Sequence, residues 1–216
     1  MKELGPNEIF YIIFAVRWTF LLSAFALVGG AAGGLIIALM RTSGRRWLEW
    51  PAIAFIRLFQ GTPLLMQLFL AFFVPSLFGF NIDALTAAAI GLSLNGSAFL
   101  GEIWRGCIDN VPKGQKEAAT ALGMRYFHRT FDVVLPQAFR IAIPPTIGYL
   151  VQLIKGTSLA AIIGFVELTR AGQIINNQTF QPFLIFGLVG AVYFVICWPL
   201  SLYSSYMERK LLPSQT

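Results

Sequence analysis

The run WTFLLSAFALVGGAAGGLIIALM, residues 18–40, holds 23 consecutive positions without a charged side chain. A helix needs roughly 20 apolar residues to cross the hydrocarbon core of a bilayer. Lipid offers no partner for backbone N–H and C=O groups, so a run of this kind must satisfy them within its own helix. The stretch therefore places the chain among helical membrane proteins.

The rest of the chain repeats this pattern. Hydrophobic residues make up 56% of the 216 positions and charged residues only 12%, whereas a soluble domain averages about 25% charged residues. Residues 58–80, 84–101 and 180–207 carry no charge, and residues 141–166 carry only Lys155. We predict an all-α membrane protein, a single domain over 1–216 with five transmembrane helices at about 18–40, 58–80, 84–104, 141–166 and 180–207.

The distribution of positive charge predicts the orientation of these helices. With five crossings, eleven cations fall on one side: Arg41, Arg45, Arg46, Arg105, Lys113, Lys116, Arg125, Arg129, Arg140, Arg209 and Lys210. Lys and Arg collect on the cytoplasmic side of membrane proteins. We therefore expect the N-terminus outside and the C-terminus in the cytoplasm. The net charge of +6 then reflects topology and contact with membrane lipids, not nucleic-acid binding.

Several kinds of chemistry find no support in the sequence. There is no G-x-x-x-x-G-K-[ST] loop for nucleotide phosphates. The single histidine, His128, has no cluster of Cys, Asp or Glu around it to form a metal site. Cys107 and Cys197 belong to distant segments, and no nucleophile and base stand at an informative spacing. We predict a protein that is not an enzyme and binds no metal or cofactor itself.

The connector at about 105–140 interrupts the apolar pattern. It is shorter than the roughly 50 residues of an independent domain. Good helix formers over 116–122 precede Gly123, which suits the position just past a helix end. We expect a second short helix over 126–134, ended by Pro136. Two short helices with a glycine between them would form a cytoplasmic protrusion.

This connector resembles the cytoplasmic loop of ABC importer permease subunits. Glu117-Ala118-Ala119, three residues, Gly123, nine residues and Val133-Val134-Leu135-Pro136 match the pattern E-A-A, three, G, nine, I-x-L-P, with valine in place of isoleucine. The segments FIRLFQGTPLLMQLF (55–69) and KGTSLAAIIGFVELTRAGQ (155–173) resemble the polar amino acid uptake branch, as do 102–124 and 135–145. The likeness covers nearly all of the chain from the first span onward.

The resemblance implies a fold, a function and partners. The fold is a type I importer permease with five spans and short coupling helices, in a bacterial inner membrane. The function is ATP-driven uptake of polar L-amino acids. The implied partners are two ABC ATPase subunits that bind ATP and Mg, a second permease subunit, identical or paralogous, and an extracytoplasmic amino-acid-binding protein. The residues implied to couple to the ATPase are Glu117, Ala118, Ala119, Ala121, Leu122 and Gly123.

Polar residues inside the spans are candidates for a substrate site, because polar groups are costly in lipid. The candidates are Asn95, Ser97, Lys155, Thr157, Ser158, Glu167 and Arg170. Each has a structural alternative. Asn95 and Ser97 can join helices, Lys155 can pair with Glu102 or extend to the headgroups, and Glu167 can pair with Arg170 one turn away.

Two further features are expected to shape the helices. Gly156-Thr157-Ser158 can loosen the fourth span and expose backbone groups, and Gln60-Gly61-Thr62-Pro63 introduces a kink at the start of the second. The alternative function is an ion-driven secondary transporter of small polar solutes. It calls for buried carboxylates of its own and usually an internal repeat, and neither is evident in the sequence.

Overall fold

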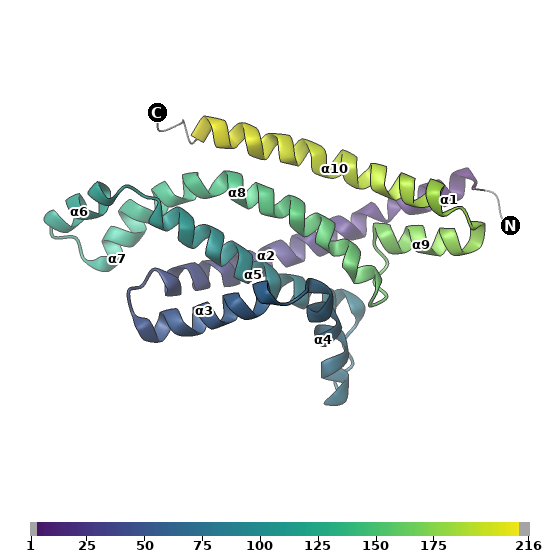
Figure 1. Cartoon of the computed structure of the whole chain (residues 1–216), viewed down its shortest axis with the longest axis horizontal. Helices are drawn as coiled ribbons and strands as arrows, with labels where there is room; N and C mark the ends of the chain where they lie inside the picture. Colours follow the sequence, from purple (N-terminus) through teal and green to yellow (C-terminus); the bar gives the residue numbers. More distant parts are fainter. Residues whose placement is uncertain (1–3, 212–216) are drawn as a thin grey trace.

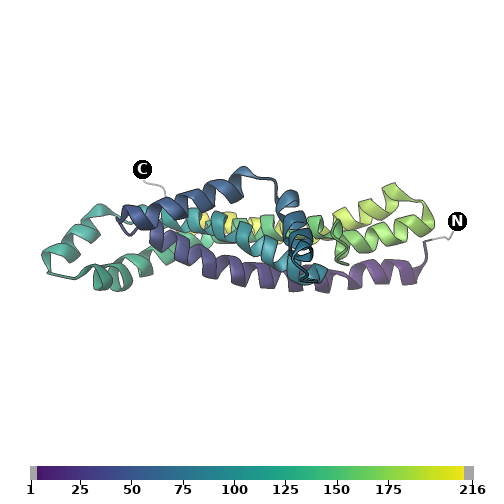
Figure 2. The same cartoon turned by 90° about the horizontal axis from the view of Figure 1, so that it is seen from below.

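The computed structural model describes residues 4–211, which are helical throughout, with short connections and no β-strand within that range. The helices form an elongated bundle (Figures 1 and 2). Helices α6 and α7 lie at one end of the long axis, while α1 and α9 lie at the other. The end of α10 points back toward the α6 end, so the two ends of the described chain lie far apart (Figure 1).

The elements follow one another in this order: α1 (Pro6–Phe14), α2 (Val16–Arg41), α3 (Arg46–Gly61), α4 (Leu64–Leu77), α5 (Ala84–Asp109), α6 (Lys113–Ala121), α7 (Tyr126–His128), the π-helix η1 (Arg129–Val134), α8 (Leu135–Gly156), the 3₁₀-helix η2 (Thr157–Ala161), α9 (Leu168–Thr179) and α10 (Pro182–Leu211).

Three helical stretches within 4–211 are long and apolar enough to cross a membrane: 6–41, 84–109 and 182–211. They contain the predicted spans 18–40 and 84–104 and most of 180–207, and they extend beyond them. The pair α3–α4 makes a fourth if it counts as one span. Helix α8 has 22 residues, but it includes Arg140, Lys155 and two internal prolines. The all-α fold is therefore confirmed, while the number of five spans is not.

The prediction of one span over 58–80 needs correction. Helix α3 begins at Arg46 and ends at Gly61, and α4 starts at Leu64 after a bend of 103°. Pro63 has no N–H to continue the helix and disfavours helical backbone at the residue before it. Thr62 accordingly adopts an extended conformation, with φ −116° and ψ 145°. The proline produces a sharp corner where the sequence predicted only a kink.

The predicted span 141–166 also differs from the structure. Helix α8 begins at Leu135, ends at Gly156 and passes into the tighter η2. The expected loosening at residues 156–158 is thus present as a change of helix type. Gly164, with φ +90°, then turns the chain toward α9, and this conformation favours glycine.

Pro136 does not end the second helix of the connector, contrary to the prediction. The chain passes from α7 through η1 directly into α8, and Pro136 occupies the first turn of α8. Pro136 has no N–H to donate, and it stands where the hydrogen-bond register changes from π to α. The π-helix η1 precedes this turn, and such segments often occur at functional sites.

Helices α2 and α5 pack in parallel along a seam of small residues. A Cβ on Gly30 would lie 3.2 Å from Cα of Gly96, and a Cβ on Gly34 would lie 2.9 Å from Cβ of Leu100. In lipid, helices associate largely through such close van der Waals packing. The glycines of residues 29–34 therefore allow the two backbones to approach.

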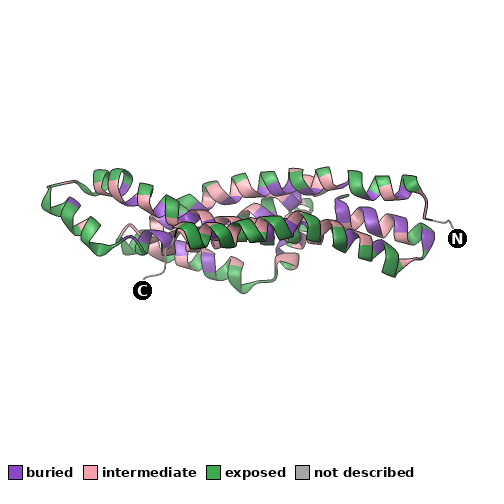
Figure 3. Cartoon of the chain, turned by 90° about the horizontal axis from the view of Figure 1, so that it is seen from above, coloured by how far each residue is buried: buried purple, intermediate pink, exposed green. Residues whose placement is uncertain are grey.

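The other long helices pack around this pair. Trp104 and Phe99 of α5 contact Thr146 and Tyr149 of α8, so these helices are antiparallel. Helix α10 lies along α8, where Ser204 Oγ donates to the carbonyl of Pro144 at 2.8 Å. Much of α10 is exposed (Figure 3), including Phe194 and Trp198. This apolar exposure fits a helix that contacts lipid or another membrane subunit.

We expect Gly34→Ala to lower the melting temperature in detergent, because the new methyl group overlaps Leu100 and the Gly101 backbone. Overpacking of this kind costs about 1–3 kcal/mol. The control is Gly190→Ala on α10, where a Cβ meets nothing within 4 Å. Thermal unfolding of both variants checks the seam, and equal melting temperatures for wild type and Gly34→Ala would contradict it.

Candidate functional site

Helix α6 ends in a hydrogen-bonded glycine cap. Gly123 has φ +73°, which favours glycine, and its N–H donates to the carbonyl of Thr120. The N–H of Met124 donates to the carbonyl of Ala119 at 3.1 Å. These two bonds form a Schellman motif, which satisfies the last carbonyls of a helix. The predicted helix end at Gly123 is confirmed.

The two faces of α6 differ in exposure. Ala119 is buried against the rest of the connector, whereas Glu117, Ala118 and Ala121 are exposed and Leu122 is 82% exposed. Five of the six predicted coupling residues therefore lie on the free surface, and Ala119 supports them from behind. The exposed face is narrow and smooth because its central side chains are methyl groups.

Side chains tie α6 to the long helices. Lys116 Nζ donates to the carbonyl of Ile108 in α5 at 3.2 Å. Arg129 donates to Thr120 Oγ1 at 2.9 Å, which links α6 to η1. Since η1 continues directly into α8, α6 is bonded to α5 and to the segment that leads into α8.

An amide network fills the corner between α3 and α4. Gln67 Nε2 lies 2.8 Å from the carbonyl of Phe59 and 3.0 Å from that of Thr62. Asn95 Nδ2 donates to Gln67 Oε1 at 3.0 Å, and Thr62 Oγ1 donates to the carbonyl of Leu58. The network satisfies carbonyls that the broken helix leaves without intrahelical donors. Asn95 thus joins helices, and its partner Gln67 was not identified from the sequence.

The other predicted hydroxyl groups bond to nearby backbone. Ser97 Oγ donates to the carbonyl of Ser93, and it lies where a Cβ of Gly33 would be. Thr157 is fully buried and donates to the carbonyl of Ile154. Ser158, only partly buried, donates to the carbonyl of Lys155. Of the three, Ser158 is the one with free access to the surface.

Glu167 caps α9. Its carboxylate accepts from the backbone N–H groups of Thr169 and Arg170, both at 2.9 Å, and from the Tyr193 hydroxyl at 2.8 Å. The Glu167 side chain is fully buried, and the Arg170 guanidinium donates to Gln173 instead. The side-chain pairing of Glu167 with Arg170, the structural alternative considered from the sequence, is therefore not formed, because the carboxylate satisfies the helix N-terminus.

Lys155 and Glu102 do not form the ion pair considered from the sequence. Lys155 is exposed at the end of α8. Glu102 accepts from Arg105 at 2.6 Å and lies 3.9 Å from Arg41 Nε. Lys155 and Glu102 lie at different levels of the antiparallel α5–α8 pair, since Phe99 and Trp104, on either side of Glu102, contact Tyr149 and Thr146 of α8.

Glu102 also borders a polar cavity of about 230 Å³ between α2, α3 and α5. Arg41, Arg57 and Gln60 share its wall with two isoleucines. The Arg41 Nε atom is buried there without a hydrogen-bond partner among residues 4–211. The cavity therefore offers charges of both signs and an amide, groups that suit a small zwitterion. Sequence patterns give little sign of it, because its residues come from three separate helices.

The predicted substrate residues come from three segments, and the last two meet at Tyr193, whose hydroxyl interacts with Thr157 and with Glu167. Asn95 and Ser97 lie on α5, Lys155, Thr157 and Ser158 at the junction of α8 and η2, and Glu167 and Arg170 at the start of α9. Substrate contact by these residues stays a prediction. In the described part of the chain, no three His, Cys, Asp or Glu side chains converge as a metal site would require.

The family model that matches the chain is "Binding-protein-dependent transport system inner membrane component", over residues 30–213. The chain is 38% identical to "Probable amino-acid ABC transporter permease protein YckA" of Bacillus subtilis, over 96% of this chain and 92% of that one. It is 39% identical to "L-cystine transport system permease protein TcyB" of the same species (91% and 84% covered). It is 35% identical to "Glutamine transport system permease protein GlnP" of Escherichia coli K12 (93% and 92%).

Solved structures agree with this result. A chain from "Crystal structure of an amino acid ABC transporter with histidines" superimposes with a TM-score of 0.86 at 35% identity, covering 93% of this chain and 94% of that one. A chain of the MetNI methionine ABC transporter, in an inward-facing conformation, gives a TM-score of 0.76 at 16% identity, covering 96% and 99%. The second likeness shows the fold alone.

We expect Gln67→Leu to destabilise the protein, because it removes the donors for the Phe59 and Thr62 carbonyls and the acceptor for Asn95. Each buried polar group left unsatisfied costs about 1–3 kcal/mol. Thermal unfolding in detergent measures the effect. Gln152→Leu on the exposed surface of α8 is the matched control. A loss no greater in Gln67→Leu than in the control would show that the corner does not need the network.

Proposed function

Because the chain belongs to the family of binding-protein-dependent transport system inner membrane components, we propose that it is the permease subunit of an ATP-driven importer of polar L-amino acids. The observation that carries the proposal is the exposed α6 face at one end of the bundle, held by bonds to α5 and η1. Its relatives and a structural neighbour are permeases or transporters of amino acids.

In this proposal, α6 docks on a separate ATPase subunit, and two permease subunits, identical or paralogous, form the path. An extracytoplasmic binding protein delivers the solute at the α9 end. The proposal places five spans in a bacterial inner membrane, with the N-terminus outside and the α6 end in the cytoplasm. The orientation is supported by the cations near α6, since basic residues favour the cytoplasmic side.

We propose that the solute path includes the cavity between Arg41, Arg57 and Glu102. An amino acid carries both an ammonium and a carboxylate, so a wall with both signs can hold each end. Lys155, Ser158 and Arg170 are candidates for contacts farther along the path, because their side chains are not buried. Asn95, Ser97, Thr157 and Glu167 would support these contacts from behind.

The direct test is transport by the reconstituted complex. Proteoliposomes that hold the permease, its ATPase and the binding protein should accumulate one or a few labelled polar L-amino acids when ATP and Mg are supplied. Omission of the ATPase or of ATP should abolish uptake. Uptake at the same rate without ATP hydrolysis, driven by a proton or sodium gradient, would overturn the proposal.

We expect Glu117→Lys and Gly123→Val to reduce the stimulation of ATP hydrolysis by the loaded binding protein. The first variant reverses a charge on the docking face, and the second introduces a β-branched residue at φ +73°. Coupling energies between sites correspond to effects of about 5–150-fold. The loss of stimulation should therefore be at least about fivefold.

Two matched controls accompany these variants. Glu208→Lys reverses an exposed charge at the end of α10, and Gly44→Val places the same side chain at φ +69° in another turn. Both should retain stimulation if they fold. If the two α6 variants keep full stimulation, α6 does not couple the ATPase to the path.

We expect Lys155→Ala to raise the KM for solute uptake by roughly tenfold, the effect of losing a hydrogen bond to a charged group. Arg45→Ala, which removes an exposed cation between α2 and α3, is the control. Uptake kinetics in proteoliposomes measure both variants. An unchanged KM in Lys155→Ala would mean that Lys155 does not contact the solute.

A further inference from the structure

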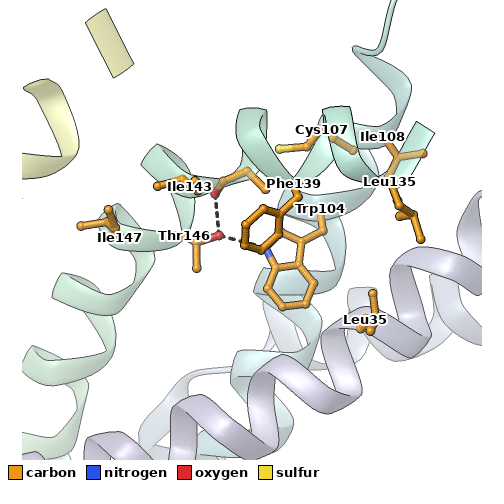
Figure 4. A pocket seen from close by; sticks show the side chains of 11 residues that line it. Leu35, Trp104, Cys107, Ile108, Leu135, Phe139, Ile143, Thr146 and Ile147 are labelled. Carbon is orange, nitrogen blue, oxygen red and sulfur yellow. Dashed lines mark hydrogen bonds between the residues drawn. The ribbon is translucent and has the colours of Figure 1, made fainter. Parts of the chain in front are cut away.

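An apolar groove lies between α5 and α8, beside α2 (Figure 4), and its volume is about 470 Å³. Its walls include Leu35, Trp104, Ile108, Phe139, Ile143 and Ile147. The groove is separate from the polar cavity, with which it shares no residue. The proposed transport function leaves it without a role.

The groove offers a ligand almost no hydrogen-bonding group. Trp104 Nε1 donates to Thr146 Oγ1 at 2.9 Å, and the Thr146 hydroxyl donates to the carbonyl of Ala142 at 2.6 Å (Figure 4). The indole N–H and the hydroxyl are thus engaged with each other and with the backbone. A ligand that fits this lining is a hydrocarbon chain, because a polar group there would lose its hydrogen bonds to water.

A positive charge stands beside this groove. Arg140 follows Phe139 and precedes Ile143 by one turn, and both of those residues line the groove. Its side chain is exposed, and it has no carboxylate partner among residues 4–211. Helix α10 runs antiparallel to α8 (Figure 1), and Ser204 of α10 bonds to Pro144 of α8. Arg209, Lys210 and Glu208 therefore lie at about the same level of the bundle as Arg140. This level carries an excess of positive charge.

We propose that the groove binds one acyl chain of an anionic phospholipid, whose phosphate contacts Arg140. The apolar wall accommodates the chain, and the guanidinium supplies a planar, charged donor for phosphate oxygens. An anionic headgroup gains about 1 kcal/mol for each Lys or Arg near it, a preference of about fivefold. Assignment of the lipid to the cytoplasmic leaflet rests on the proposed orientation, whereas binding itself does not.

The groove also touches the coupling end of the molecule. Ile108, one of its wall residues, provides the carbonyl that holds Lys116 of α6. Leu135, another wall residue, follows directly after η1. A bound acyl chain would therefore pack immediately behind the segments that carry α6.

The test is lipid retention by the full-length purified chain, measured by native mass spectrometry after titration with phosphatidylglycerol or phosphatidylcholine. Wild type should retain one phosphatidylglycerol per chain, with about fivefold preference over phosphatidylcholine. Arg140→Gln should remove this preference. Ala142→Phe, which fills the groove, should weaken retention of either lipid by about tenfold or more, because the excluded methylenes lose their burial.

Arg46→Gln, an exposed cation at the start of α3, is the control and should bind both lipids as wild type does. Arg140→Gln changes only a surface side chain, so it decides the charge step even if Ala142→Phe does not fold. If wild type and Arg140→Gln retain the two lipids in the same ratio, the proposal is overturned. Loss of self-association in Ala142→Phe with lipid retention unchanged would also overturn it, since the groove would then be a protein interface. Neither outcome affects the transport assay.

Discussion

The close approach of α2 and α5 is the constraint on which the other packing depends. Lipid does not drive helices together as water does, so the pair relies on backbones that come within van der Waals distance. Gly30 and Gly34 permit this approach to Gly96 and Gly101. Around the pair, α8 packs antiparallel on α5, and α3 and α4 pack against the same helix. Helix α5 thus contacts each of the other helices that border the polar cavity or the apolar groove, namely α2, α3 and α8.

Two helical segments of the bundle are interrupted, α3–α4 at its corner and α8 where it passes into η2. Irregular backbone is tolerated at membrane depth only where protein or a water-filled path satisfies it. At the α3–α4 corner, Gln67 and Asn95 supply the missing donors. At the α8–η2 junction, the Thr157 and Ser158 hydroxyls bond to carbonyls of the preceding turn. Both interruptions leave polar groups beside the closely packed α2–α5 pair, an arrangement that suits a path for a small polar solute.

Part of this structure could be predicted from the sequence. Uncharged runs located the long helices, because the bilayer imposes their length, and Gly123 marked the end of α6 because its cap requires positive φ. The 103° corner was missed because proline shows that a helix is interrupted but not in which direction the chain continues. Gln67 lies alone in an apolar run, and that isolation was the available signal. The partners of Glu102 and Glu167 could not be predicted, because they depend on which donors lie within hydrogen-bonding distance of each carboxylate in the folded chain.

The central proposal is that the exposed face of α6 docks on the ATPase. Disulfide cross-linking from a single cysteine at position 122 tests it most directly, because Leu122 is 82% exposed and Cys107 and Cys197 are both buried. In the assembled complex, Leu122→Cys should form a cross-link to a cysteine introduced into the ATPase, and the yield should change with nucleotide. A cysteine at the buried position 119 should not. A complex with full substrate-stimulated ATP hydrolysis but no cross-link from position 122 to any ATPase position would contradict the account.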